Sequence, residues 1–352
     1  MSFENLIEKR ISPEEAVNIF NNAAVPELGF YADAFKRRLY GSMATFIKNM
    51  HLNVTNICVN SCRFCNFKKK KGEAGSYVLS IDKALELVEE ASKTGIREVH
   101  LVNALNLDLK LSFYVSLVQK IKEAFPSLTV KGLTAVEIDF LARIEKILPE
   151  AVVDALIEAG VELFPGGGAE IFNPEIRRLL GTSKTPGETY LKIHEIIHSR
   201  GIKSNATMLY GHFEAPAHIV EHLLALRELQ DRTGGFSAFI PLRFVSDNTP
   251  LKVEQKGANY DLKIIAFSRL FLDNFPHIKA YWVSLTPEVA QVALNYGADD
   301  LDGTIYRENI IRAAGAKVKP GLSSEELSGL IKGASLTPVE RDSFFNKVKV
   351  SA

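Results

Sequence analysis

The sequence is poor in cysteine and tryptophan, and it carries no excess of charge. Only three cysteines and one tryptophan occur in 352 residues. So small and odd a cysteine count excludes a disulfide framework as the basis of the fold. Lys and Arg number 42, as do Asp and Glu, so the formal net charge is zero. The chain as a whole therefore offers no electrostatic basis for binding nucleic acid or a membrane surface.

Long apolar runs are also missing, and no segment is long enough to span a bilayer. The first residues, Met1 to Asn5, show neither the basic nor the apolar region of a signal peptide. We therefore expect a cytoplasmic protein with no membrane or nucleic-acid partner. Hydrophobic residues make up 46% of the chain and charged residues 24%, a composition typical of folded globular proteins. Disorder is thereby excluded as the main state.

A helical stretch followed by a glycine and a short apolar run recurs along the chain. Gly95, Gly160, Gly201 and Gly297 each occupy this position. Glycine commonly follows a helix C-terminus, and apolar runs of this length suit buried strands. With the gaps filled, eight strands are expected near residues 51–58, 98–104, 128–134, 162–167, 203–209, 236–242, 279–284 and 299–304.

Helices are expected between these strands, for example over residues 81–93, 110–124, 188–199, 217–232, 262–274 and 287–295. Strand–helix alternation predicts a parallel sheet in an α/β fold. Eight units favour a closed (β/α)8 barrel of the TIM type, and an open, doubly wound sheet is the alternative. We expect residues 1–47 to be an N-terminal helical segment, in which Ser12 caps a helix beginning at Pro13. Residues 48–314 would form the barrel, and 315–352 a helical tail packed on it.

All three cysteines lie in one eight-residue window, Cys58-x-x-x-Cys62-x-x-Cys65, where the first strand is expected to end. Thiolates are the preferred ligands of iron–sulfur clusters. A [4Fe–4S] cluster has four irons, so three cysteines leave one iron open to a small molecule. The alternative is a structural zinc site with His51 as the extra ligand. We favour the cluster, since three thiolates alone do not complete a structural zinc shell.

This cysteine spacing, after the first strand of a parallel barrel, resembles the radical S-adenosylmethionine enzymes. Further segments resemble the aminofutalosine synthase family of menaquinone biosynthesis, and they cover nearly the whole chain from about residue 48. These segments are residues 53–58, 165–171, 205–212, 239–242, 272–274, 277–282, 299–304 and 338–342. The resemblance implies one [4Fe–4S] cluster per chain, S-adenosyl-L-methionine as cofactor, and a flavodoxin- or ferredoxin-type reductant.

The reaction that this resemblance implies begins with addition of a 5′-deoxyadenosyl radical to the small-molecule substrate 3-[(1-carboxyvinyl)oxy]benzoate. Rearrangement and loss of carboxylate would then give 6-amino-6-deoxyfutalosine. One alternative is the sister enzyme, the dehypoxanthine futalosine cyclase. A second, of another class, is a non-catalytic iron–sulfur electron carrier. The concentration of glycine and charged residues at the expected strand ends argues against the carrier.

Ligand-binding residues of such a barrel lie at the C-terminal ends of its strands. The candidates for binding S-adenosyl-L-methionine are Phe64, Asn103, Gly167, Gly168, Glu170 and Arg177. The glycines are either a tight turn or a nest of N–H groups for a carboxylate. Glu170 could receive the methionine ammonium, or it could simply be a charge near a helix N-terminus. Arg177 could bind the methionine carboxylate, or it could lie on a solvated helix face. Phe64 could pack on the adenine, or it could belong to the core.

The candidates for contacting the substrate are Thr134, Glu137, Tyr210, His212 and Arg243. Arg243 stands where the sixth strand should end. We expect it either to pair with an acid such as Asp247 or to receive a substrate carboxylate.

Two features depart from the family pattern. A Gly-Gly-x-x-Pro motif usually follows the second strand, and residues 103–107 of this chain read Asn-Ala-Leu-Asn-Leu. This change falls where the methionine amino group is normally held. Arg243 and Val245 stand where the family usually has Ala and His, near the expected substrate pocket.

Two other motifs have simpler interpretations. Residues 194–198 read His-Glu-Ile-Ile-His, a zinc-protease pattern, but Ser204 stands where a third histidine would be. We therefore expect an ordinary outer helix. Lys68–Lys71 is either a solvated loop, as most charge runs are, or a docking site for an acidic reductant.

Overall fold

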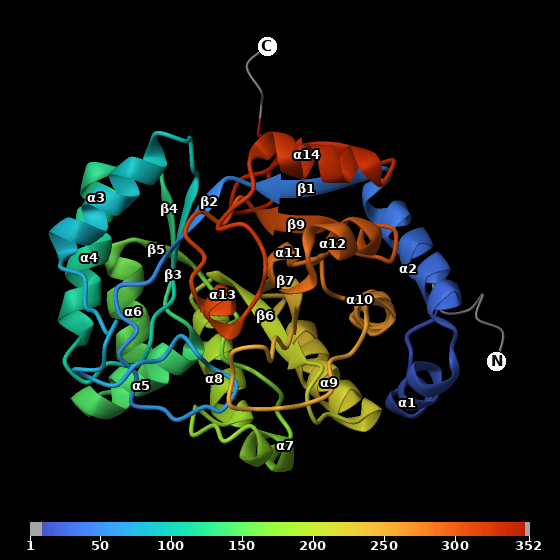
Figure 1. Cartoon of the computed structure of the whole chain (residues 1–352), viewed down its shortest axis with the longest axis horizontal. Coiled ribbons are helices and arrows are strands. Elements are labelled where there is room, and N and C mark those ends of the chain that lie inside the picture. Colours follow the sequence, from blue (N-terminus) through green and yellow to red (C-terminus); the bar gives the residue numbers. More distant parts are fainter. Residues whose placement is uncertain (1–8, 349–352) are drawn as a thin grey trace.

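The computed structural model describes residues 9–348, and its largest sheet is a curved layer of seven parallel strands (Figure 1). The strands are β2 (Asn49–Leu52), β3 (Glu98–Leu101), β4 (Thr129–Gly132), β5 (Val161–Phe164), β6 (Lys203–Tyr210), β7 (Phe236–Arg243) and β8 (His277–Ile278). Each strand pairs with the next one along the chain. This order is the one that repeated strand–helix units produce in a barrel.

A second sheet closes the arrangement, with the order β10-β1-β9. It contains β1 (Met43–Ile47), β9 (Asp300–Gly303) and β10 (Thr337–Glu340). The Ala280 amide donates to the Asp300 carbonyl at 2.8 Å, which links the end of β8 to β9. The His51 amide donates to the Tyr306 carbonyl at 2.9 Å, which links β2 to the chain after β9. Main-chain bonds thus connect all eight barrel strands, and the predicted TIM-type α/β fold is confirmed.

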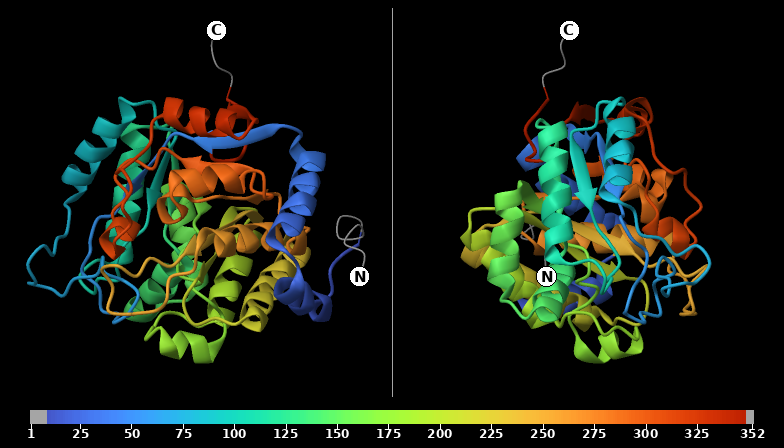
Figure 2. Two further views of the ribbon diagram at one scale, coloured as in Figure 1. Left: turned by 45° about the vertical axis from the view of Figure 1, so that its right-hand side comes forward. Right: turned by 90° about the vertical axis from the view of Figure 1, so that its left-hand side faces the viewer.

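Helices cover the outside of the barrel, as Figures 1 and 2 show. The helices that follow β2 to β8 are α3 (Ile81–Ser92), α4 (Leu111–Ala124), α5 (Ala135–Glu145), α6 (Pro149–Ala159), α7 (Pro174–Leu179), α8 (Gly187–Ser199), α9 (Pro216–Thr233), α10 (Ala258–Phe271), α11 (Trp282–Leu285) and α12 (Pro287–Ala293). The six helices named from the sequence are confirmed within a few residues at each end. The structure adds α5, α6, α7 and α11. None of the helices within residues 9–348 has the length and apolarity needed to cross a bilayer.

Strands near the two ends of the described residues, 9–348, pair on one side of the barrel. Helices α1 (Pro13–Asn22) and α2 (Val25–Tyr40) precede β1, and the Ser12 hydroxyl caps α1 as expected, by accepting from the Glu15 amide at 3.2 Å. Near the other end, α13 (Ile310–Ala314) and α14 (Ser324–Gly333) precede β10. Strand β1 pairs with β10 in parallel, and α14 lies beside β1 in Figures 1 and 2.

Four expectations about these elements were wrong. The first strand, expected over 51–58, is β2 and ends at Leu52, six residues before Cys58. Met43–Ile47 is a strand rather than helix, and the tail ends in strand β10 after its helix. The strand expected over 279–284 is also wrong, since β8 ends at Ile278 and Trp282–Leu285 is helical. The Trp282 indole N–H donates to the Gly303 carbonyl at 2.9 Å, which fixes this turn against β9. The division of the chain at residues 47 and 314 remains a prediction.

Alternation along the strands separates an apolar layer from a polar one. Met50, Val99 and Val130 are aligned across β2, β3 and β4, and all three are fully buried in the main apolar core. The next residue of each strand lies on the opposite face of the sheet. These residues are His51, His100 and Lys131, so the barrel interior is polar at this level.

Candidate active site

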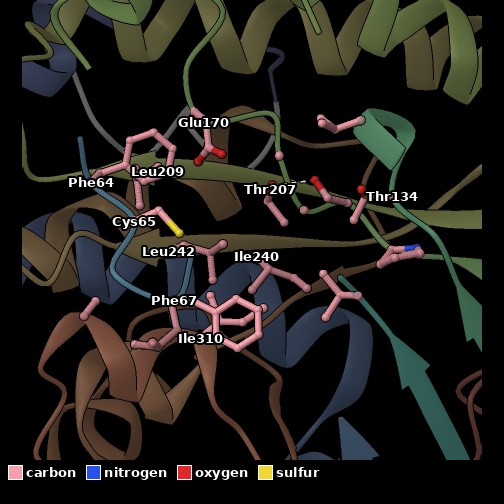
Figure 3. A pocket seen from close by; sticks show the side chains of 18 of the residues that line it. Phe64, Cys65, Phe67, Thr134, Glu170, Thr207, Leu209, Ile240, Leu242 and Ile310 are labelled. Carbon is pink, nitrogen blue, oxygen red and sulfur yellow. Dashed lines mark hydrogen bonds between the residues drawn. The ribbon is translucent and has the colours of Figure 1, made fainter. Parts of the chain in front are cut away.

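The strand ends enclose a cavity of about 250 Å³ (Figure 3). Its lining comes from every part of the barrel, from Cys58 after β2 to Asp302 on β9. Of the predicted site residues, ten line it: Cys58, Phe64, Cys65, Asn103, Thr134, Glu137, Gly167, Gly168, Glu170 and Arg243. Figure 3 shows Cys65 and Glu170 toward one end of the cavity and Thr134 toward the other. The cavity therefore extends from the cysteine loop to Thr134 at the start of α5.

The cysteine loop crosses the cavity mouth with three free thiols. Cys58 and Cys65 line the cavity, and Cys62 is buried beside it with its Sγ 3.3 Å from the Thr182 Oγ1. The Lys68 ammonium donates to the Cys62 carbonyl at 2.5 Å and so braces the loop from within. Burial raises the pKa of the Cys65 thiol, while the nearby Lys184 ammonium opposes this rise.

These thiols fit an iron–sulfur cluster better than a single metal ion. Within residues 9–348, no group of three or more His, Cys, Asp or Glu side chains is placed to hold one metal ion. Thiolates on a cubane each bind a different iron, so they need not converge on one point. The zinc alternative needed His51 beside the cysteines, but its ring packs against His100 with centroids 4.7 Å apart.

Lys184 lines the cavity together with the cysteine loop and was not among the site residues predicted from the sequence. Its ammonium lies 2.6 Å from the Glu170 carboxylate and 5.2 Å from the centre of the Phe64 ring. Burial opposes its charge, yet Glu170 and Cys62 raise the pKa of Lys184 above its ordinary value. Glu170, predicted to receive an ammonium group, is therefore already paired with one from this chain.

The glycine-rich turn after β5 is tightly constrained. A Cβ on Gly166 would lie 2.5 Å from the Asn205 carbonyl oxygen, and Gly168 has a φ of +95°. Glu170 also has a positive φ, 52°, which a residue with a side chain seldom adopts. The turn is thus shaped to bring backbone and the Glu170 carboxylate close to the cavity.

Arg177, one candidate for binding the methionine carboxylate, does not line the cavity. Its guanidinium donates to the carbonyls of Ala169 at 2.8 Å, Ile171 at 3.2 Å and Thr185 at 2.5 Å. Nor is it on a solvated face, since the residue is only 7% exposed. Arg177 therefore holds the Glu170 turn in place.

Asn103, Thr134 and Glu137 form one hydrogen-bonded group on the cavity wall. Glu137 accepts from the Asn103 amide at 2.9 Å and its side chain at 3.1 Å. It also accepts from the Thr134 amide at 2.8 Å and hydroxyl at 2.7 Å. Burial raises the pKa of Glu137 to about 7, although these hydrogen bonds lower it. The Asn103 side-chain oxygen accepts from the Val54 amide at 2.7 Å, so Asn103 links the segment after β2 to the start of α5.

Arg243 lines the cavity, but its acidic partner is Asp261 rather than Asp247. The closest approach of the two side chains is 3.7 Å, and a second Arg243 nitrogen donates to the Lys256 carbonyl at 3.0 Å. The Tyr210 hydroxyl also donates to Asp261, at 2.9 Å. Burial raises the pKa of Asp261 to about 6, although Arg243 and Tyr210 lower it.

Tyr210 and His212, both predicted to contact substrate, lie outside the cavity lining. Tyr210 is fully buried behind β6, on the side of α10. The His212 ring lies 2.9 Å from the Leu209 carbonyl and accepts from the Phe213 amide at 2.7 Å. Both side chains are therefore engaged in supporting the loop after β6.

The zinc-protease pattern is an outer-helix feature, as expected. His194 and His198 lie on α8, and each forms a 2.8 Å hydrogen bond with the Ser204 hydroxyl. Ser204 thus takes the place that a metal ion would need. Burial lowers the pKa of His198 to about 4.

Comparison with known proteins agrees with this geometry. A family model for the radical SAM superfamily matches residues 52–226, and one for a CofH/MqnC C-terminal region matches residues 233–351. The aminodeoxyfutalosine synthase of Thermus thermophilus is 40% identical over 97% of this chain and 93% of its own. The chain belongs to the radical SAM superfamily. As a radical SAM enzyme it is a catalyst, and the predicted resemblance to aminodeoxyfutalosine synthases is confirmed.

Two further comparisons concern a relative with a different activity and a solved structure with the same fold. The cyclic dehypoxanthine futalosine synthase of Streptomyces coelicolor is 36% identical over 97% of this chain and 86% of its own. Among solved structures, a methylornithine synthase superposes with a TM-score of 0.77, covering 95% of this chain and 96% of that one at 16% identity. This radical SAM enzyme therefore shares the complete barrel with that structure, and the similarity concerns the fold alone.

Proposed function

We propose that this radical SAM enzyme is an aminodeoxyfutalosine synthase of menaquinone biosynthesis. Its substrate would be 3-[(1-carboxyvinyl)oxy]benzoate and its product 6-amino-6-deoxyfutalosine. The observation that carries the proposal is the 40% identity to the Thermus synthase across 97% of the chain. The cavity supports this proposal, since it adjoins the cysteine loop and is lined by both polar and apolar residues. Such a cavity suits an aromatic substrate with carboxylates at its two ends.

The three thiols would hold a [4Fe–4S] cluster, and Glu170 with the backbone of Gly167 and Gly168 would hold the methionine part of S-adenosyl-L-methionine. When bound, these groups supply one-electron cleavage of the sulfonium to a 5′-deoxyadenosyl radical. Phe64 and Glu170 lie toward the same end of the cavity in Figure 3, and the Phe64 ring would pack on the adenine. Lys184 would release Glu170 to the methionine ammonium and remain beside the thiolates.

The protein's own contribution is to bind, orient and shield the reacting groups. Leu209, Ile240 and Leu242 form an apolar wall next to Cys65 (Figure 3), which keeps water from a reactive carbon radical. Arg243 follows Leu242 in the cavity lining and would receive the carboxylate of the vinyl ether. With that carboxylate fixed, the vinyl carbon would face the 5′ carbon of the adenosyl group.

The second candidate is the cyclic dehypoxanthine futalosine synthase reaction, because the relative with that activity is 36% identical over nearly the same length. The reconstituted enzyme should be given each candidate substrate separately under anaerobic conditions, and the specificity constants compared. We expect turnover of the vinyl ether to exceed turnover of dehypoxanthine futalosine at least a hundredfold. The reverse order of the two constants would assign the cyclase reaction instead.

A further inference from the structure

Two histidines at the floor of the cavity have no role in the site described so far. His51 and His100 are register partners on β2 and β3, and both line the cavity. Their rings meet edge to face, with centroids 4.7 Å apart and planes inclined by 74°. His51 is 6% exposed. The Nε2 atom of each ring is buried with no hydrogen-bond partner among the residues that the structure describes.

The charged groups around this pair are already matched with one another. Lys131 lies 2.9 Å from Glu98, and Lys279 lies 2.6 Å from Asp302. The remaining pair is formed by Arg341 and Asp300, whose closest approach is 2.5 Å. The interior of a TIM barrel is usually filled by branched apolar side chains, so polar residues at this depth need a reason. Within each of these pairs the opposite charges are matched, whereas the Nε2 atoms of both histidines have no hydrogen-bond partner among the described residues.

Both imidazoles are neutral in the free protein. Burial lowers the pKa of His51 to about 4; Asp302 and Glu98 oppose this, while Lys131 and Lys279 add to it. Burial likewise lowers the pKa of His100, and the neighbouring His51 and Lys131 add to the effect. A neutral imidazole offers one N–H donor and one acceptor. A carboxylate placed between the rings could therefore accept from both, and its charge would favour protonation of one ring.

We propose that His51 and His100 bind the ring carboxylate of the aromatic substrate at the floor of the cavity. This inference rests on the proposed function and specifies which end of the substrate lies deepest. The vinyl group must face the cysteine loop, because the adenosyl radical forms there. The ring carboxylate is the opposite end of the molecule, and His51 and His100 lie within the strands, below the loops that carry the cysteines. Val102 and Ile240 line the cavity and offer apolar contact to the ring.

The test uses 3-hydroxybenzoate, which retains the ring carboxylate and lacks the vinyl ether. Reconstituted enzyme with S-adenosyl-L-methionine and no reductant should be titrated by calorimetry in two buffers of different ionisation enthalpy. We expect binding with net proton uptake, and affinity that falls as pH rises, because the bound anion raises a histidine pKa. His51→Gln and His100→Gln should each weaken binding about tenfold or more and abolish the uptake.

His218→Gln is the matched control. His218 accepts from the Ala215 amide at 3.1 Å at the start of α9, and glutamine can keep that capping contact. The affinity of this control variant for 3-hydroxybenzoate, and its proton uptake, should equal those of the unchanged enzyme. The neutral analogue 3-hydroxybenzamide should bind weakly and without proton uptake. Iron content and far-ultraviolet circular dichroism would identify a floor variant that fails to fold, and the pH dependence of the unchanged enzyme then decides the question.

Binding of 3-hydroxybenzoate with unchanged affinity in both floor variants, or with no proton uptake in the unchanged enzyme, would overturn the proposal. The proposed function is tested separately by product formation. An enzyme that makes aminodeoxyfutalosine but shows no proton uptake contradicts the floor site alone. An enzyme that binds 3-hydroxybenzoate with uptake, yet makes no aminodeoxyfutalosine, contradicts the synthase assignment and supports an aryl-carboxylate site.

Discussion

The ammonium of Lys184 lies 2.6 Å from the carboxylate of Glu170, next to the cysteine loop. This ion pair joins the loop after α7 to the glycine-rich turn after β5, and its side chains are only 22% and 8% exposed. Cys62 and Cys65 both interact electrostatically with the Lys184 charge. The pair therefore places one positive charge beside the thiols and one negative charge where the methionine ammonium is expected.

Replacing Lys184 by Met should make the cluster harder to reduce. Removing a buried positive charge beside thiolates disfavours addition of an electron, and we expect the midpoint potential to fall on the order of tens of millivolts. Redox titration followed by electron paramagnetic resonance measures this shift. Lys192→Met, on an exposed face of α8, is the control and should leave the potential unchanged. Equal potentials for both variants would show that Lys184 does not act on the cluster.

Glu137 should make the apo protein less stable as the pH rises. Its carboxyl titrates near 4.5 when exposed and at about 7 when folded, so the folded state binds more protons between these values. The free energy of unfolding should fall over that window, by up to about 3 kcal/mol, and level off above it. Urea unfolding across this range, with Glu137→Gln, measures the slope. The variant should lose that slope, whereas the exposed Glu158→Gln on α6 should keep it.

Arg243 has a structural partner, so its substrate role must be separated from its ion pair. Arg243→Ala leaves Asp261 buried without its cation, and we expect a stability loss of about 2 kcal/mol. Adding Asp261→Asn removes that buried charge and should restore most of the stability. If Arg243 binds substrate, the double variant still forms 5′-deoxyadenosine slowly, with at least about tenfold less product. A product yield equal to that of Asp261→Asn alone would assign Arg243 to structure.

The lysine run beside the cluster offers a test of reductant docking. Lys68 is not available for docking, since its ammonium donates to the Cys62 carbonyl. Lys69 lies 2.9 Å from Glu73, and Lys71 lies 2.7 Å from Asp108. We therefore expect Lys69, Lys70 and Lys71, changed together to Gln, to slow turnover with flavodoxin and to weaken its salt dependence. Turnover with dithionite should be unchanged. Equal slowing with both reductants would discard the docking hypothesis.

The order of the elements could be predicted because helix caps and apolar runs are local signals. The direction of each strand side chain, into or out of the barrel, follows from the alternation of side chains along the strand. On β6, Asn205, Thr207 and Leu209 line the cavity, whereas Tyr210 points to the opposite face. Counting by twos from a known inward residue would have excluded Tyr210 as a substrate contact. The same count would have placed His51 and His100 inside the barrel.

Lys184 and Asp261 carried no local signal of this kind. Lys184 reaches the cysteines only because the chain after α7 folds back over the Glu170 turn, held there by Arg177. Asp261 lies on an outer helix, and its contact with Arg243 depends on how α10 packs against β7. Contacts of this type follow from tertiary packing, so single-sequence reasoning could not find them. For the same reason the sequence gives no sign that the Arg177 guanidinium donates to the backbone carbonyls of Ala169, Ile171 and Thr185.

The most direct test of the proposed synthase reaction follows the 5′ carbon of the adenosyl group. The reconstituted enzyme should be incubated anaerobically with dithionite, 3-[(1-carboxyvinyl)oxy]benzoate and S-adenosyl-L-methionine labelled with ¹³C at the 5′ carbon, and the products analysed by mass spectrometry. We expect the label to appear in 6-amino-6-deoxyfutalosine, and Cys62→Ala to abolish both this product and cofactor cleavage. Label found only in 5′-deoxyadenosine, with the vinyl ether unconsumed, would contradict the proposed reaction.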